Sequence, residues 1–219
     1  KLNMILSRKN PYLFKAKNLD AHDLVKSILD AYLSSREEAL FGTFLEKLAI
    51  YVSRIFCGGK KSVAKGIDLE FERGNKLYLI SIKSGPHWGN SSQIKRMVDY
   101  FNTAKKIHKT NNKSSEIQAI CGCCYGRDDS PFKKDDFVKL CGKRFWDFIT
   151  EDENFYIDIV EPLGYKAKEK NESFNKQYNK VVNKFSKQFY IDFCDEDGNI
   201  LWSKIMELTS KPKKNQSLS

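Results

Sequence analysis

The spacing of apolar positions predicts two helices in the first quarter of the chain. Residues 18–32 carry apolar side chains at helical spacing behind a capping residue. Ser35 and Glu38 have capping-box spacing and open a second predicted helix that Gly58 ends. Its apolar stripe comprises Leu40, Phe41, Phe44, Leu45, Leu48, Val52 and Ile55. Glu46 lies off this stripe.

Two runs of alternating residues then predict a β-hairpin with the Gly-Asn pair 74–75 as its loop, because a leading glycine suits a two-residue type II′ turn. This loop pairs Arg73 with Lys76 and places Asp68 opposite Ser81. Since side chains alternate across a strand, the hairpin has one apolar and one polar face. The apolar face comprises Ile67, Leu69, Phe71, Tyr78, Ile80 and Ile82, and the polar face comprises Asp68, Glu70, Ser81 and Lys83.

After the hairpin, the pattern predicts one more helix and one more strand, and the rest of the chain is predicted to be mainly helical. Asn90 and Gln93 have capping spacing, and the helix after them has an inward face of Ile94, Met97, Val98, Phe101, Ala104 and Ile107. Residues 117–126 predict a strand, residues 137–148 a helix, and residues 174–193 a longer helix. Residues 154–160 fit either a strand or a helix.

This order of elements predicts an α/β (α+β) fold, with a mixed β-sheet flanked by helices and a helical C-terminal part. We expect one domain over residues 1–210, with a core at 18–126 and a helical part at 133–210 that serves dimerisation or DNA contact. The polar tail 211–219 is expected to be disordered.

Charge and cysteine content narrow the class of protein. The 219 residues include 38 Lys and Arg against 28 Asp and Glu, and a net charge of +10 favours a polyanionic partner such as nucleic acid. Six cysteines without a disulfide-like spacing predict free thiols, and the CGCC string lacks the paired CxxC spacing of a zinc site. No apolar run is long enough to cross a membrane and no secretory signal is present, so we expect a cytoplasmic protein.

Asp68 and Lys83 are the candidate catalytic residues. On one face of the hairpin, a carboxylate and an ammonium lie within reach of each other, as in enzymes that cut phosphodiesters. The carboxylate would hold a divalent cation, and the lysine would orient water or offset charge on the phosphate. A plain cross-strand ion pair is the structural alternative.

The strings GIDLEF and SIKSGPHWGNSSQ, with LFGTFLEKLAIYV before and CGCCYG after, resemble type II restriction endonucleases of the PD-(D/E)XK superfamily, in particular a group that cuts interrupted GC-rich palindromes. The likeness spans roughly residues 10–210. It implies a Mg²⁺-dependent, site-specific endonuclease for double-stranded DNA that acts as a homodimer beside a companion DNA methyltransferase without direct contact. On this resemblance, Asp68 is the metal-binding aspartate and Lys83 is the motif lysine.

One position departs from the pattern, because Ser81 stands where the motif has an acid. A serine brings no charge, so another carboxylate is needed for an active enzyme. Glu46 is the first candidate and Glu70 the second. The predicted catalytic residues are therefore Asp68, Lys83, Ser81 and Glu46, and the predicted metal-binding residues are Asp68, Glu46, Glu70 and Ile82.

The helix that begins after Asn90 offers free amide groups to a DNA phosphate, or is simply a capped turn. His87 is assigned a structural or phosphate-contacting role, and Trp88 a packing role. The predicted DNA-binding residues are Ser84, His87, Asn90, Ser91, Gln93, Lys95, Arg96 and Arg127. Two alternatives stay open, which are a catalytically inactive DNA-binding protein on the same fold and a structure-specific repair nuclease.

Overall fold

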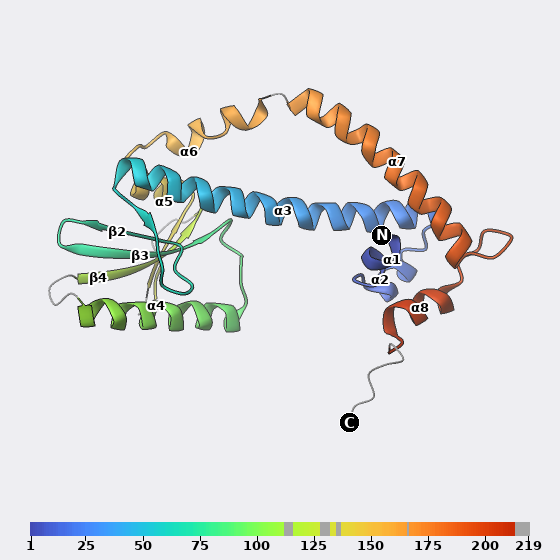
Figure 1. The fold of residues 1–219 in the computed structure, drawn as a ribbon, viewed down its shortest axis with the longest axis horizontal. Helices are drawn as coiled ribbons and strands as arrows, with labels where there is room; N and C mark the ends of the chain where they lie inside the picture. Colours follow the sequence, from blue (N-terminus) through green and yellow to red (C-terminus); the bar gives the residue numbers. More distant parts are fainter. Residues whose placement is uncertain (112–115, 128–131, 135–136, 166, 213–219) are drawn as a thin grey trace. The chain divides into compact units, whose positions relative to one another are not determined.

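The computed structural model describes residues 1–111, 116–127, 132–134, 137–165 and 167–212. Contacts divide the chain into two compact units, one of Lys1–Glu38 with Lys166–Ser219 and one of Ala39–Tyr165. Helix α3 (Ala21–Phe56) contributes to both units (Figure 1). The single domain over residues 1–210 stays a prediction.

The first unit is helical. It contains α1 (Leu2–Leu6), α2 (Pro11–Ala16), the start of α3, α7 (Ala167–Phe193) and α8 (Trp202–Ser210). Its core includes the fully buried side chains of Leu2, Leu24, Ile28, Phe189 and Ile205. Residues 21–32 and 174–193 are helical as predicted, within α3 and α7. Of the predicted disordered tail, residues 213–219 lie outside the described residues.

The second unit is built on a six-stranded mixed sheet with the order β1-β2-β3-β4-β6-β5. Its strands are β1 (Lys60–Lys61), β2 (Leu69–Arg73), β3 (Lys76–Lys83), β4 (Glu116–Cys123), β5 (Phe132–Lys134) and β6 (Phe137–Cys141). Strands β3, β4 and β6 run parallel, and the other pairs are antiparallel. The predicted mixed sheet flanked by helices is therefore confirmed.

Helices cover both faces of this sheet (Figure 1). On one face, the second half of α3 and helix α5 (Lys143–Thr150) pack through Ala49, Phe145 and Trp146 onto Leu69 and Ile80. On the other face, α4 (Ser91–Asn111) packs onto the sheet. This second cluster includes Leu77, Leu79, Met97, Phe101 and Cys121. A short helix α6 (Phe155–Asp158) and a 3₁₀ helix η1 (Glu161–Gly164) follow α5.

The structure confirms the hairpin and its register. Arg73 pairs with Lys76 and Leu69 with Ile80, as the Gly-Asn loop predicts. Gly74 has a φ of 62° whereas Asn75 is not among the positive-φ residues, which fits a type II′ turn. Within the described part of the chain, no helix is both long and apolar enough to span a membrane.

The prediction of two separate N-terminal helices is wrong, because α3 is continuous from Ala21 to Phe56. Ser35 does not cap a new helix. Its hydroxyl donates to the carbonyl of Ala31 at 3.0 Å, one turn back in the same helix. The capping-box spacing of Ser35 and Glu38 was therefore a false signal, since serine also bonds within a helix.

Three smaller predictions also need correction. Residues 137–141 form strand β6 rather than helix, because their pairing with β4 places Phe137 and Cys141 in the core. Ile67 packs on the α4 side of the sheet and not with the apolar face of the hairpin. Ile107 is 51% exposed on α4 instead of buried. Residues 154–160, which fitted either strand or helix, contain the helical turn α6.

Candidate active site

The hairpin places Asp68 against the end of β3. The backbone N–H of Asp68 donates to the carbonyl of Ile80 at 2.9 Å, so the antiparallel pairing continues just before β2 begins. The carboxylate oxygen Oδ2 accepts the N–H of Ile82 at 2.7 Å and the hydroxyl of Ser81 at 3.3 Å. A carboxylate held by a backbone amide keeps a defined position.

Lys83 completes this cluster from the end of β3. Its Nζ donates to Ser81 Oγ at 2.9 Å and to the carbonyl of Ile82 at 3.0 Å, and it lies 4.0 Å from Asp68 Oδ2. The side chains of Asp68 and Lys83 are each 25% exposed, so the cluster is open to a ligand. Among the described residues, no hydrogen bond or ion pair reaches Asp68 Oδ1. We call Asp68, Ser81 and Lys83 the catalytic cluster.

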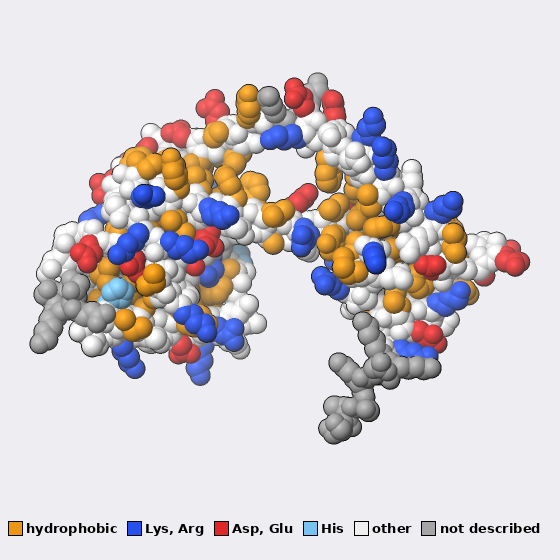
Figure 2. All heavy atoms as spheres, in the orientation of Figure 1, with side chains coloured by type: hydrophobic (Ala, Val, Ile, Leu, Met, Phe, Trp, Pro, Cys, Tyr) orange, Lys and Arg blue, Asp and Glu red, His pale blue; other side chains and the backbone are white. Residues whose placement is uncertain are grey.

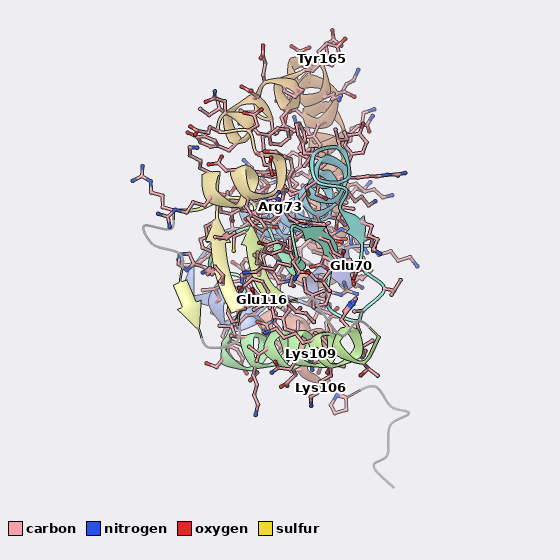
Figure 3. All side chains as sticks on the ribbon, turned by 90° about the vertical axis from the view of Figure 1, so that its left-hand side faces the viewer. Glu70, Arg73, Lys106, Lys109, Glu116 and Tyr165 are labelled. Carbon is pink, nitrogen blue, oxygen red and sulfur yellow. The ribbon has the colours of Figure 1, made fainter. Side chains whose placement is uncertain are left out.

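Glu70 lies on the same face of the sheet but belongs to another cluster. Its carboxylate accepts the hydroxyl of Ser62 at 2.6 Å and lies 3.8 Å from His108 Nε2 of α4 and 3.4 Å from Lys60 Nζ. Figure 3 shows Glu70 on the sheet above α4. The Glu70 side chain is 7% exposed, so these partners already satisfy a buried carboxylate. We call Ser62, Glu70 and His108 the buried cluster.

Glu46 lies on the face of α3 that meets the strand ends. One helical turn before it, a Cβ on Gly42 would lie 2.7 Å from Ser84 Oγ, so α3 passes close to the end of β3 at this point. Burial, with the Glu46 charge as a second cause, raises the pKa of Cys124 to about 12. Glu46 is half-buried and makes no hydrogen bond or ion pair with the described residues. Among the described residues, its carboxylate therefore has no partner that a metal ion would have to displace.

The predicted DNA-binding residues gather where β3 and β4 end. Asn90 and Gln93 exchange the two hydrogen bonds of a capping box, at 3.0 and 3.1 Å, which confirms the predicted start of α4. His87 and Arg127 are exposed in the segments that follow the two strands. Ser91, Lys95 and Arg96 are exposed on the first turns of α4, whereas Ser84 is partly covered. Their contact with DNA stays a prediction.

Lys139 of β6 also lies near this site, although the sequence pattern does not predict it. Its Nζ donates to the carbonyl of Pro86 at 2.9 Å, in the segment that follows Lys83. In the sheet, Lys139 pairs with Cys121, and Cys121 pairs with Ser81. Because residues 137–141 were predicted to be helical, this neighbourhood could not be seen from the sequence.

The thiols next to the catalytic cluster are buried. A hydrogen bond from Cys123 lowers the pKa of Cys121, and Lys83 and Lys139 act in the same direction. The same contact with Cys121 and burial raise the pKa of Cys123. All six cysteines are free. Of these, Cys121 and Cys123 lie on β4 directly beside Ser81 and Lys83.

The catalytic cluster offers oxygen ligands to a hard cation. Asp68 Oδ1 and the Ile82 carbonyl are such ligands, and Mg²⁺ uses only one or two carboxylates, with water and substrate phosphate completing its octahedral shell. In the described part of the chain, no three His, Cys, Asp or Glu side chains are arranged to hold a metal ion. Asp68 and Ile82 therefore supply two oxygen atoms that a cation could use, and a metal site built on them stays a prediction.

A family model described as "Type II restriction endonuclease EcoO109I" matches residues 1–171 of the chain. This range contains the whole sheet and each predicted site residue. No curated protein matches the sequence.

Proposed function

This chain belongs to the family of the type II restriction endonuclease EcoO109I, and from this premise we propose a Mg²⁺-dependent, site-specific DNA endonuclease with the catalytic cluster as its active site. One observation carries the proposal. Lys83 Nζ lies 4.0 Å from Asp68 Oδ2 at the end of β3, where both side chains are partly exposed, while Asp68 Oδ1 has no protein partner among the described residues. This arrangement suits hydrolysis of a phosphodiester.

Each residue of the cluster has a role that follows from its contacts. Asp68 is fixed by the Ile82 amide and presents its other oxygen to a cation. Lys83 carries a positive charge next to it and can orient a water molecule or offset charge that develops on the phosphate. When bound, Mg²⁺ supplies a Lewis acid that polarises a phosphate oxygen and lowers the pKa of a coordinated water. Ser81 holds Lys83 in this position.

We assign the chain to the PD-(D/E)XK superfamily with Glu46 as the relocated acid. Two contrasting surroundings support this choice. Glu70 is buried and bonded to Ser62, so its recruitment to a metal would break a satisfied cluster. Glu46 is uncommitted and lies one turn from the contact of Gly42 with Ser84.

The remaining parts of the proposal concern partners. The family implies that the chain binds DNA, and the +10 net charge supports contact with phosphates. We propose a homodimer that reads the two halves of an interrupted GC-rich palindrome, because a two-fold target calls for a two-fold enzyme. A companion methyltransferase without direct contact and a cytoplasmic location complete the proposal.

A second candidate function is a DNA-binding protein that has lost catalysis. Ser81 favours it, because the catalytic cluster has a single carboxylate where a metal site with a motif acid has two. A repair nuclease on this fold is a further alternative, which differs in leaving no discrete fragments.

Plasmid cleavage separates these functions. We expect wild-type protein to give discrete bands in Mg²⁺ and no cutting in EDTA, and Asp68→Ala and Lys83→Ala to be inactive while still binding DNA. A smear instead of bands indicates the repair nuclease. Equal inertness of wild type and both variants, with DNA binding retained, would leave only the binding protein.

A further inference from the structure

The indole ring of Trp88 covers the ammonium group of Lys83. Nζ lies 5.1 Å from the ring centroid, within the ~6 Å over which an aromatic face attracts a cation. Trp88 is half-buried and packs at the edge of the cluster between the sheet and α4. The Lys83 ammonium thus has two hydrogen bonds, to Ser81 and to the Ile82 carbonyl, and a cation–π contact with the Trp88 ring.

The segment that carries Trp88, residues 84–90, is fixed at both ends. At its start, the N–H of Tyr125 donates to the carbonyl of Ser84 at 3.0 Å, and the Tyr125 ring packs directly on Gly85, so that a side chain there would have to displace the ring. At its end, Asn90 caps α4. Trp88 therefore sits on a short loop that is anchored at both ends. We call residues 84–90 the lysine loop.

Lys139 anchors the middle of the lysine loop. It reaches from β6, two strands away from Ser81, to donate to the carbonyl of Pro86 at 2.9 Å. Pro86 is two residues before Trp88. An ammonium group gives a charge-assisted hydrogen bond, which is stronger than one between neutral groups. Lys139 accordingly links β6 to the loop two residues before Trp88.

We propose that Trp88 is a positioning residue for Lys83 and that Lys139 acts through Trp88 by holding Pro86. The inference rests on the proposed function, in which Lys83 is the motif lysine. A lysine has a long flexible stem and loses much rotamer freedom when its ammonium is held in one place. The contact with the ring limits the movement of the Lys83 ammonium, so that it stays beside Asp68 when DNA binds. Neither Trp88 nor Lys139 touches the reacting atoms in this proposal.

Two substitutions at Trp88 separate positioning from packing. Trp88→Phe keeps an aromatic face, whereas Trp88→Leu keeps apolar volume without one. We expect Trp88→Leu to cut plasmid DNA about tenfold more slowly under single-turnover conditions with saturating protein, and Trp88→Phe to stay within about threefold of wild type. DNA affinity should change less than about twofold in both. Equal rates for the two variants, or a loss in affinity alone, contradict the proposal.

A double-mutant cycle tests the role of Lys139. Lys139→Met removes the contact with Pro86, and we expect it to slow cutting by about as much as Trp88→Leu. The double variant should be no slower than either single one, because both changes act through the ring. Losses that multiply would show that Lys139 acts independently of Trp88. Lys106→Met, on the exposed surface of α4 (Figure 3), is the matched control and should cut like wild type.

A spectroscopic readout keeps the placement of Trp88 testable apart from DNA cleavage. After reductive ¹³C-dimethylation, which retains the positive charge, the methyl signal of Lys83 should carry a ring-current shift from Trp88. Its assignment follows from its absence in Lys83→Arg. The shift should persist in Trp88→Phe and disappear in Trp88→Leu. A signal that Trp88→Leu leaves unchanged overturns the placement, whereas a wild-type protein that shows the shift but never cuts DNA overturns the proposed function instead.

Discussion

Two carboxylates on one face of the sheet, Asp68 and Glu70, are two residues apart and have opposite surroundings. Asp68 is held by a backbone amide, faces a lysine and is 25% exposed. Glu70 is 7% exposed and is bonded to Ser62 beside His108. Strand position made both of them candidates for the metal site. The partners of each carboxylate decide which one is open to a ligand and which one stabilises the fold.

The largest expected effect comes from the lysines next to the two carboxylates, Lys83 beside Asp68 and Lys60 beside Glu70. We expect Lys83→Met, which keeps the stem and removes the charge, to slow DNA cleavage about 1,000-fold. Lys60→Met removes the lysine that lies 3.4 Å from Glu70 and is mostly exposed, so cleavage should stay within about twofold of wild type. Single-turnover rates on plasmid DNA measure both. A similar fall in cleavage rate in both variants would contradict the assignment of catalysis to the cluster that contains Lys83.

The acid that replaces the missing motif carboxylate should have the next largest effect. Glu46→Gln is expected to slow cleavage about 100-fold and to raise the Mg²⁺ concentration needed for half-maximal rate, because it removes a negative charge at the strand ends. Glu116→Gln, an exposed carboxylate at the start of β4 (Figure 3), is the control and should leave both quantities unchanged. A Glu46→Gln enzyme with normal Mg²⁺ dependence would point to a metal site without Glu46.

Substitution of the serine in each cluster should affect stability more in the buried cluster than in the catalytic cluster. Ser62→Ala leaves a buried carboxylate without its 2.6 Å hydrogen bond and should lower the free energy of unfolding by about 1–3 kcal/mol. In Ser81→Ala, water can replace the lost hydrogen bonds of Asp68 and Lys83, because both side chains are partly exposed. The free energy of unfolding should therefore fall by less than about 1 kcal/mol. Urea denaturation gives both values. The rate of DNA cleavage should fall in Ser81→Ala and stay unchanged in Ser62→Ala.

Restoring the motif acid should give the smallest effect. Ser81→Asp puts a second carboxylate beside Asp68, and the two like charges should lower the melting temperature in EDTA. Added Mg²⁺ should recover about 2–4 °C in this variant and less in wild type, because binding to the folded state stabilises it. Thermal unfolding with and without Mg²⁺ measures the difference. Equal recovery in both proteins would place the ion away from Ser81.

The parts of the site that depend on local sequence could be predicted. The hairpin register follows from the Gly-Asn loop at residues 74–75, and the capping box of Asn90 and Gln93 spans three residues. The pairing of Asp68 with Ser81 then needs only the alternation of side chains along two strands. Mixed sheet and flanking helices followed from the order of the elements.

The parts that depend on distant packing could not be predicted. The burial of Glu70 requires His108, at the other end of α4, and the contact of Lys139 with Pro86 requires the strand order β3-β4-β6. The continuous helix α3 was missed for a local reason, because the hydroxyl of Ser35 can either cap a helix or bond within one. Spacing alone does not separate these two uses.

The most direct test of the catalytic cluster compares isosteric changes at the two carboxylates. Asp68→Asn and Glu70→Gln each replace one carboxylate by an amide of similar size, and single-turnover cleavage of plasmid DNA is measured for the folded fraction in Mg²⁺. We expect Asp68→Asn to lose cleavage about 1,000-fold or more and Glu70→Gln to stay within about threefold of wild type. Cleavage by Asp68→Asn at the wild-type rate, or a folded Glu70→Gln protein that is equally inactive, would contradict the assignment of the active site.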